Sequence, residues 1–235
     1  MNKAPLALAV ALACAAPAGA DLIAYWNFNA STPNSSSGQL GVLESLAPDA
    51  GSGTLTFSSG ITLNTVSDGT ADGNAGTFAG TTLNAIGGDA SGGALTITGG
   101  IGGGGDVISN GQSFTFGIDM TGYQDLVVTF ATRGTATGFN NNQLSWSTDG
   151  VTFTDFGPAW DGRPTSFFLV TRDLSSVDAL DNASTVFIRI TLDGATSAAG
   201  NNRFDNVQFN ATLIPAPGAA ALLGLGGLIA GRRRR

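Results

Sequence analysis

The chain has 235 residues, of which 35 are Gly, one is Cys and none is His, and its formal net charge is −7. The absence of His excludes Ser-His-Asp and Cys-His catalysis and any metal site built on imidazole. Lys3 is the only Lys, so a Schiff-base mechanism and a lysine-based phosphate site are both excluded from the folded part.

The first element, residues 1–20, has the order of a secretory signal peptide. Lys3 supplies a positive start, residues 6–13 are apolar, and a small-x-small cleavage site precedes Asp21. The apolar run is too short to span a membrane. Cys14 leaves a lipoprotein cleavage site open as an alternative. With ordinary signal-peptide cleavage the mature chain has no Cys, so no disulfide stabilises it.

Residues 21–213 are predicted to form one domain. They hold 17 acidic residues against five Arg, a net charge of −12. Because so acidic a domain repels nucleic acid and anionic lipid, neither is expected as its partner. The Gly-rich run 87–105 contains no Lys and has no strand–loop–helix setting. It is therefore predicted to form surface loops around one short strand at 94–98.

Apolar residues in this domain recur with a period of two, which predicts β-strands. The spacing of these strands, with Gly, Asn and Asp between them, is typical of an all-β, jelly-roll-like β-sandwich. Since such folds often place their terminal strands side by side, we expect residues 22–28 to pair antiparallel with residues 204–211. Asp149 and Gly150 are predicted to form a hairpin turn, and residues 176–181 one helical turn. The predicted strands, in chain order, are 22–29, 94–98, 113–118, 126–130, 143–147, 151–153, 167–172, 186–192 and 203–212.

The stretch from about residue 125 to residue 210, with WSTDGVTF, LDGAT and GNNRFDNVQF, resembles the later half of exported bacterial jelly-roll domains. Related sandwiches of the carbohydrate-binding type often carry a structural calcium ion between their terminal strands. Asp and Asn side chains supply the oxygen ligands that Ca²⁺ prefers. The alternative is that Asp205 pairs with Arg203 or Arg189, or caps a turn. The resemblance implies one structural calcium with the candidate ligands Asp205, Asn206, Asn202, Asn27 and Asn29.

Aromatic side chains in loops are candidates for stacking on sugar rings. Trp160 lies between two predicted strands, with Asp161 and Arg163 beside it as hydrogen-bonding groups. The alternative for Trp160 is that its ring packs inward and anchors the loop, whereas Trp26 and Trp146 are expected in the core because they lie in strands. A second polar loop of similar character contains Asn140, Asn141 and Asn142.

The last element, residues 214–235, has three parts in a fixed order: a Pro-x-Pro motif, an apolar helix at 219–231 and a terminal cluster of Arg. It resembles the PEP-CTERM sorting signal, in which the middle residue of the motif is commonly Glu. The resemblance implies export in a Gram-negative-type bacterium, transient anchoring in the inner membrane, recognition by an exosortase, and a place at the cell surface or in the exopolysaccharide matrix. The residues that carry it are Pro215, Ala216, Pro217, Gly218, Arg232, Arg233, Arg234 and Arg235.

These features predict an exported, exosortase-sorted and non-catalytic protein of the cell surface or extracellular matrix, with a structural or adhesive role. The alternative is a carbohydrate-binding module for exopolysaccharide. Glycoside hydrolysis is a weaker third hypothesis. It needs two suitably spaced carboxylates, whereas the Asp residues here fall mainly in turns.

Overall fold

A computed structural model describes residues 19–30, 40–66, 71–101 and 105–215. Most of the predicted signal peptide, with Lys3 and Cys14, lies outside these residues. So does the predicted sorting signal from residue 216 onward, which includes its apolar helix and its four Arg. Within the described residues, no helix is long and apolar enough to cross a membrane.

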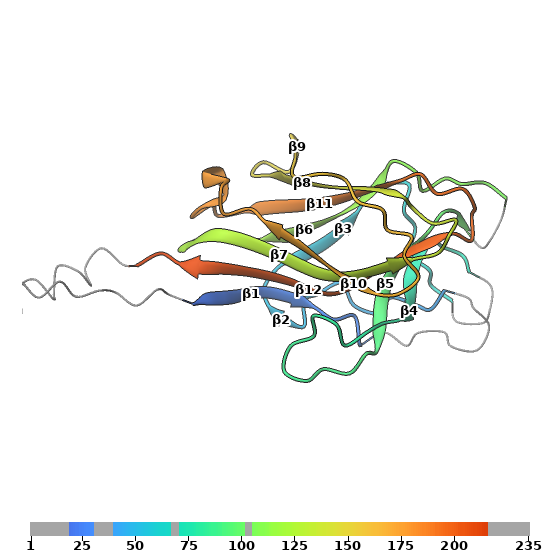
Figure 1. The fold of residues 1–235 in the computed structure, drawn as a ribbon, viewed down its shortest axis with the longest axis horizontal. Coiled ribbons are helices and arrows are strands. Elements are labelled where there is room, and N and C mark those ends of the chain that lie inside the picture. Colours follow the sequence, from blue (N-terminus) through green and yellow to red (C-terminus); the bar gives the residue numbers. More distant parts are fainter. Residues whose placement is uncertain (1–18, 31–39, 67–70, 102–104, 216–235) are drawn as a thin grey trace, which may run out of the picture.

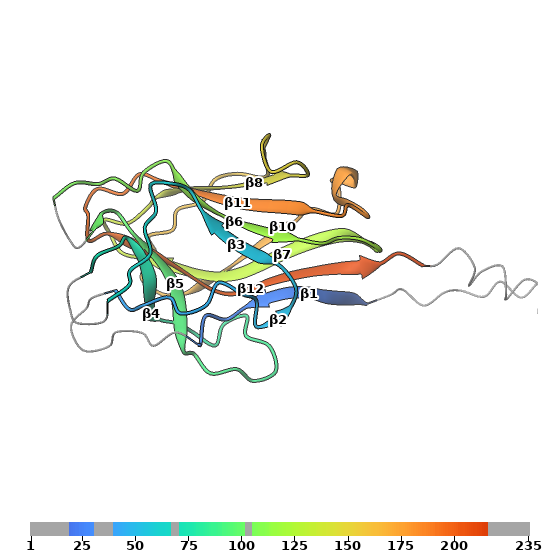
Figure 2. The same cartoon turned by 180° about the vertical axis from the view of Figure 1, so that it is seen from behind.

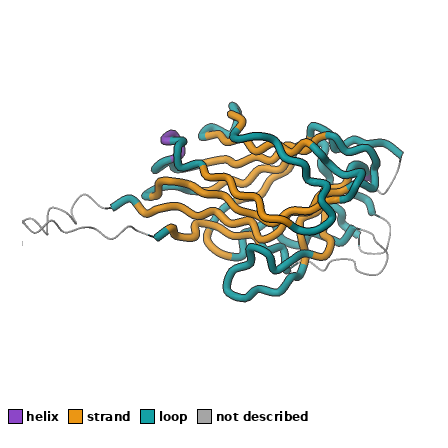
Figure 3. Tube along the Cα trace, viewed as in Figure 1, coloured by secondary structure: helices purple, strands orange, loops and turns teal. Residues whose placement is uncertain are grey.

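The regular secondary structure of the described residues is almost entirely β-strand, arranged in two sheets that long loops connect (Figure 3). The seven-stranded sheet has the order β10-β7-β12-β1-β2, and β5 lies between β12 and β4. Its strands are β1 (Ala20–Trp26), β2 (Ala50–Gly51), β4 (Ala75–Ala79), β5 (Gly93–Thr98), β7 (Tyr123–Gly134), β10 (Phe168–Asp173) and β12 (Asn201–Leu213). The five-stranded sheet has the order β3-β6-β11-β8-β9. Its strands are β3 (Thr54–Phe57), β6 (Gln112–Ile118), β8 (Asn141–Ser147), β9 (Thr154–Asp155) and β11 (Val186–Asp193).

The two sheets lie as separate layers, which confirms the predicted β-sandwich (Figures 1 and 2). Apart from the short β9, successive strands from β6 to β12 alternate between the layers. The predicted helical turn is also confirmed, as a 3₁₀ helix at Asp178–Leu180.

The core between the sheets is formed by the apolar residues that alternate along the predicted strands. Val186, Ile188, Ile190 and Leu192 of β11 are all buried, because alternate side chains of a strand point to the same face. Aromatic rings from the two layers pack against each other. The ring centres of Trp26 in β1 and Phe116 in β6 lie 4.8 Å apart, and those of Phe114 in β6 and Phe204 in β12 lie 4.9 Å apart. Full burial of each such side chain stabilises the fold by roughly 1.5–3 kcal/mol. Trp26 is fully buried and Trp146 packs against the core, as predicted.

One predicted strand, at 151–153, is wrong, and three short strands were not predicted. The chain does not resume a strand at Val151, which is 83% exposed; it pairs again with β8 only at β9, after the turn at Asp149 and Gly150. Asp149 accepts backbone N–H groups from Val151 and Thr152, which holds these residues in the turn. Strands β2, β3 and β4 were not predicted, since they are only two, four and five residues long.

The terminal strands pair as predicted: β1 runs antiparallel to the second half of β12, from Ala20 opposite Thr212 to Trp26 opposite Val207. The first half of β12 pairs instead with β5. The strand thus changes partner at Asp205 and Asn206, and there its pairing with β7 shifts register. Asn206 has a positive φ of 49° at this irregularity. Such a bulge turns side chains out of the regular alternation.

Candidate functional site

Asp205 and Asn206 lie at the point where β12 changes partner, and both are fully buried. The two carboxylate oxygens of Asp205 accept backbone N–H groups, from Thr81 at 2.7 Å and from Asn206 at 2.8 Å. Burial raises the pKa of Asp205 to about 8, and the charge of Asp49 adds to this increase. No ion pair joins Asp205 to Arg203 or Arg189. Its contacts are therefore with the backbone, as in the turn-capping alternative.

The side chain of Asn206 fastens the loop of residues 80–92 to the sheet. Its Oδ1 accepts a 2.7 Å hydrogen bond from the Tyr25 hydroxyl. Its Nδ2 donates to the carbonyl oxygens of Thr81 and Leu83, at 2.7 and 2.9 Å. The loop therefore lies beside β1 and β2 (Figure 1), and the bulge in β12 is its attachment point.

Asn27 and Asn29, just after β1, bind the other end of the same loop. Asn27 donates from Nδ2 to Asp89 at 2.9 Å. Asn29 donates to the carbonyl of Ala90 and accepts the backbone N–H of Gly93. The structure thus brings four of the five predicted calcium ligands to one loop.

The fifth predicted ligand, Asn202, lies apart from them. It is three residues before Asp205 in β12, so its side chain points to the opposite face of the sheet. There it donates to the carbonyl of Phe139 and accepts the backbone N–H of the same residue. No group of three or more acidic, His or Cys side chains that could hold a metal occurs among the described residues. The arrangement fastens a loop, and calcium binding stays a prediction.

Trp160 is half-buried, and its ring packs against other side chains. The ring lies 5.7 Å from that of Phe130, and the Arg172 guanidinium lies 5.0 Å from its centre. Two backbone hydrogen bonds of 3.0 Å join Trp160 to Asn142. The side chain of Asn142 is fully buried, and neither of its polar atoms has a partner among the described residues. These contacts correspond to the loop-anchoring alternative for Trp160.

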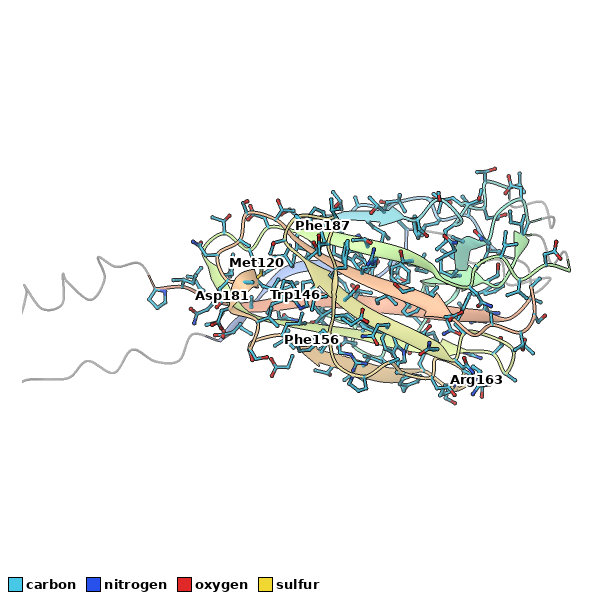
Figure 4. All side chains as sticks on the ribbon, turned by 90° about the horizontal axis from the view of Figure 1, so that it is seen from above. Met120, Trp146, Phe156, Arg163, Asp181 and Phe187 are labelled. Atoms are coloured by element: carbon cyan, nitrogen blue, oxygen red, sulfur yellow. The ribbon has the colours of Figure 1, made fainter. Side chains whose placement is uncertain are left out.

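The remaining predicted carbohydrate ligands are exposed at the surface. Asp161 and Arg163 form an ion pair at 2.8 Å, with side chains 48% and 39% exposed. Hydrogen bonds from Arg163 lower the pKa of Asp161. Arg163 lies at the end of the sandwich away from the arrowhead of β12 (Figure 4). Asn140 and Asn141 are also exposed. The structure offers these four polar residues no fully exposed aromatic partner, since the Trp160 ring is packed.

The strand pairing assembles a surface feature that the sequence did not reveal. Arg203 in β12 lies directly opposite Arg133 in β7. Each guanidinium is stacked on an aromatic ring: Arg203 lies 4.8 Å from the centre of Phe78, and Arg133 lies 5.7 Å from that of Phe167. Arg203 precedes the buried Phe204, so the two arginines project from the outer face of the seven-stranded sheet. We call Phe78, Arg203, Arg133 and Phe167 the arginine strip.

The two positive charges of the strip are not neutralised by the protein. The one ion pair between described residues is that of Arg163 with Asp161. The Nε atoms of Arg133 and Arg203 are buried and have no partner among the described residues, and Arg203 donates through Nη1 to the carbonyl of Ala79. Burial lowers the pKa of Arg203 to about 10, and the neighbouring charge of Arg133 contributes. Like charges directly opposite each other destabilise a sheet.

No family model and no curated protein matches this chain. Among solved structures it is similar to the CBM22-1 xylan-binding domain from Paenibacillus barcinonensis Xyn10C, at 10% identity and a TM-score of 0.47 over 86% of this chain and 100% of that one. TmCBM61 in complex with beta-1,4-galactotriose has 10% identity and a TM-score of 0.35, over 67% and 86% of the two chains. The K3 adhesin domain of Lys-gingipain from Porphyromonas gingivalis has 12% identity and a TM-score of 0.42, over 82% and 99%. Because every one of these TM-scores is below 0.5, the likeness carries no argument about function.

Proposed function

We propose that the chain is an exported, non-catalytic carbohydrate-binding module with a jelly-roll-like sandwich, and that the arginine strip is its binding face. The observation that carries the proposal is the stacking of Arg133 on Phe167 and of Arg203 on Phe78, on the outer face of one sheet. Two of the solved structures named above are a xylan-binding domain and a complex with galactotriose, which agrees with the proposal but does not carry it.

The strip combines the two kinds of contact that sugars use. Phe78 and Phe167 are partly exposed, and aromatic rings supply apolar area for the C–H faces of sugar rings. Each guanidinium carries five N–H donors for hydroxyl or ring oxygens. The four residues are distributed across neighbouring strands from the start of β10 to β4. At a strand spacing of about 4.8 Å, this is a strip of roughly 19 Å. Its length favours a polymer over a single sugar.

The strip itself contains no carboxylate, which separates binding from hydrolysis. Glycoside hydrolysis requires an acid and a second carboxylate on either side of the scissile bond. Asp205 is the one acidic side chain that is buried among the described residues, and its oxygens accept backbone N–H groups instead of facing a cleft. Carbohydrate binding thus replaces the structural or adhesive role as the function that we favour.

Binding is tested by electrophoresis of the purified full chain in gels that contain a panel of neutral and acidic polysaccharides. Phe78→Ala and Phe167→Ala should weaken retardation by about tenfold or more, since each removes a stacking contact. Phe153→Ala is the matched control. The Arg189 guanidinium of the other sheet stacks on Phe153 in the same way, with its Cζ 3.6 Å from the ring centre. Lack of retardation by every polysaccharide, or equal loss in the control, would contradict the proposal.

The export and sorting part of the proposal rests on the two ends of the chain. We propose that residues 1–20 direct secretion and that residues 214–235 direct exosortase-dependent anchoring. Replacing Arg232, Arg233, Arg234 and Arg235 by Ser should abolish surface display, because a polybasic end retains a short apolar helix in the membrane. Surface labelling of intact cells measures this. Unchanged display of the Ser variant would overturn the sorting proposal and leave the binding proposal untouched.

A further inference from the structure

The charge of the arginine strip contrasts with that of the domain around it. The domain has a net charge of −12 and only five Arg, yet two of these five lie opposite each other in one strand pair. With 17 acidic residues in the domain, compensation by a neighbouring carboxylate would be easy to arrange. The ion pair of Arg163 with Asp161 shows that this chain forms such pairs elsewhere. The strip thus concentrates positive charge where the protein supplies no anion.

The geometry of the strip suits a carboxylate. A guanidinium is planar and binds a carboxylate through two parallel N–H donors, a match that an ammonium group lacks. Phe78 and Phe167 lie beneath the two guanidiniums. Arg203 donates one hydrogen bond from Nη1 to the carbonyl of Ala79, and Arg133 donates to no described residue. Because both Nε atoms are buried, the donors left for a ligand are the remaining N–H groups of the Nη atoms.

From these observations we infer that the ligand is an acidic polysaccharide, and that Arg133 and Arg203 bind the carboxylates of its uronate units while Phe78 and Phe167 contact the sugar rings. The inference rests on the proposed carbohydrate-binding function and adds the chemical class of the ligand.

The acidity of the rest of the domain makes this inference unusually testable. Residues 21–213, with a net charge of −12, repel polyanions at long range. Adventitious ion exchange, which a basic protein would show with any acidic polymer, is therefore disfavoured. Binding of a polyuronate then has to come from a local cationic site. Because the cluster Arg232–Arg235 is another such site in the sequence, the test uses the chain in which these four Arg are replaced by Ser, and all further variants are made in it.

The test compares polygalacturonate with its methyl ester, because both have the same backbone and only the first has free carboxylates. Dextran sulfate supplies the other common anion of polysaccharides, and dextran is the neutral control. The full chain should bind polygalacturonate at least about tenfold more tightly than the ester, since hydrogen bonds to charged groups are the strong ones. Titration calorimetry in 150 mM salt measures the affinities.

Three sets of variants assign the effect to the strip. The double variant Arg133→Gln/Arg203→Gln should lose the preference for polygalacturonate. The double variant Arg133→Lys/Arg203→Lys keeps the charge but loses the planar fork, and it should bind less tightly than the wild type. The single variant Arg189→Gln changes the net charge by the same amount per residue away from the strip, and it should bind within about twofold of the wild type. Melting curves confirm that each variant is folded.

Each contrary outcome has a distinct meaning. Equal affinity for the ester and the free acid would overturn the inference and leave the carbohydrate-binding proposal in place. Binding of dextran sulfate without polygalacturonate would overturn the assignment to uronates. An equal loss in Arg189→Gln would show that the effect is one of net charge and not of the strip. No binding to any of the polymers in this test or in the polysaccharide panel would contradict the proposed function itself.

Discussion

The hydroxyl of Tyr25 in the first strand donates a 2.7 Å hydrogen bond to Oδ1 of Asn206 in the last, across 181 residues of sequence. Both side chains are almost completely buried, and burial raises the pKa of the Tyr25 hydroxyl, which stays protonated as a donor. The Nδ2 of Asn206 also donates hydrogen bonds to the carbonyls of Thr81 and Leu83. One amide therefore joins the two terminal strands and the loop of residues 80–92.

The first prediction concerns the stability that is lost when this amide is removed. Asn206→Leu should lower the free energy of unfolding by at least about 3 kcal/mol, because it removes the acceptor of the buried Tyr25 hydroxyl and the donor to two carbonyls. Leu is also strained at the φ of 49° that Asn adopts there. Urea denaturation measures the difference.

The matched control is Asn142→Leu, which makes the same change at a fully buried amide with no hydrogen-bond partner among the described residues. Here an unsatisfied polar group is replaced by an apolar one of similar branching, so stability should change by less than about 1 kcal/mol or rise. Equal destabilisation by the two substitutions would mean that Asn142 has polar contacts of its own.

A second prediction concerns pH. Burial raises the pKa of Asp205 to about 8 in the folded protein, whereas an unfolded Asp titrates near about 3.9. The folded state therefore holds a proton that the unfolded state releases. The stabilisation from this proton is complete below about pH 4 and is lost as the pH rises through the folded pKa of about 8. Its upper limit is on the order of 5 kcal/mol.

Melting midpoints between pH 4 and pH 9 test this linkage. The wild type should lose stability over that range. Asp205→Asn should show a flatter profile, because its side chain does not titrate and can still accept the N–H of Thr81. Parallel profiles for the two proteins would show that the carboxyl group of Asp205 is not the source of the pH dependence.

A third prediction follows from the tight contact between Gly80 and the bulge. A Cβ at Gly80 would lie 2.3 Å from Oδ2 of Asp205 and 2.4 Å from the carbonyl oxygen of Ser91. Gly80→Ala should therefore displace the loop and destabilise the protein by about 1–3 kcal/mol. Gly105→Ala is the control, since a Cβ there has no neighbour within 4 Å. Thermal melting that shifts equally in both variants would be inconsistent with the packing described.

A fourth prediction addresses calcium. If the loop held by Asp205, Asn206, Asn27 and Asn29 also binds a structural ion, millimolar Ca²⁺ should raise the melting midpoint over that in EDTA, because an ion bound only by the folded state stabilises it. Asp205→Asn should remove the increase. An unchanged midpoint at pH 9, where Asp205 is ionised, would rule out a structural ion at this position.

Much of the fold was predictable because period-two alternation is a local property of the chain. The alternation in residues 186–192 predicts a strand with one buried face. In the structure these residues lie in β11, and alternate side chains of this strand are buried. The jelly-roll-like pattern of strands likewise predicted that the first strand pairs with the last. The short strands β2, β3 and β4 escaped prediction because two to five residues are too few for a period-two pattern to stand out.

The sequence by itself determined the class of the fold, the acidity of the domain and the absence of His and Lys from its chemistry. It also singled out Asp205 and Asn206, as candidate calcium ligands in a segment rich in Asn and Asp. Only the tertiary structure decided what these residues contact, and only strand register placed Arg133 beside Arg203, 70 positions later in the chain. The physical reason is that alternation tells which face a side chain occupies, whereas its neighbour on that face depends on which strands pair and in which register.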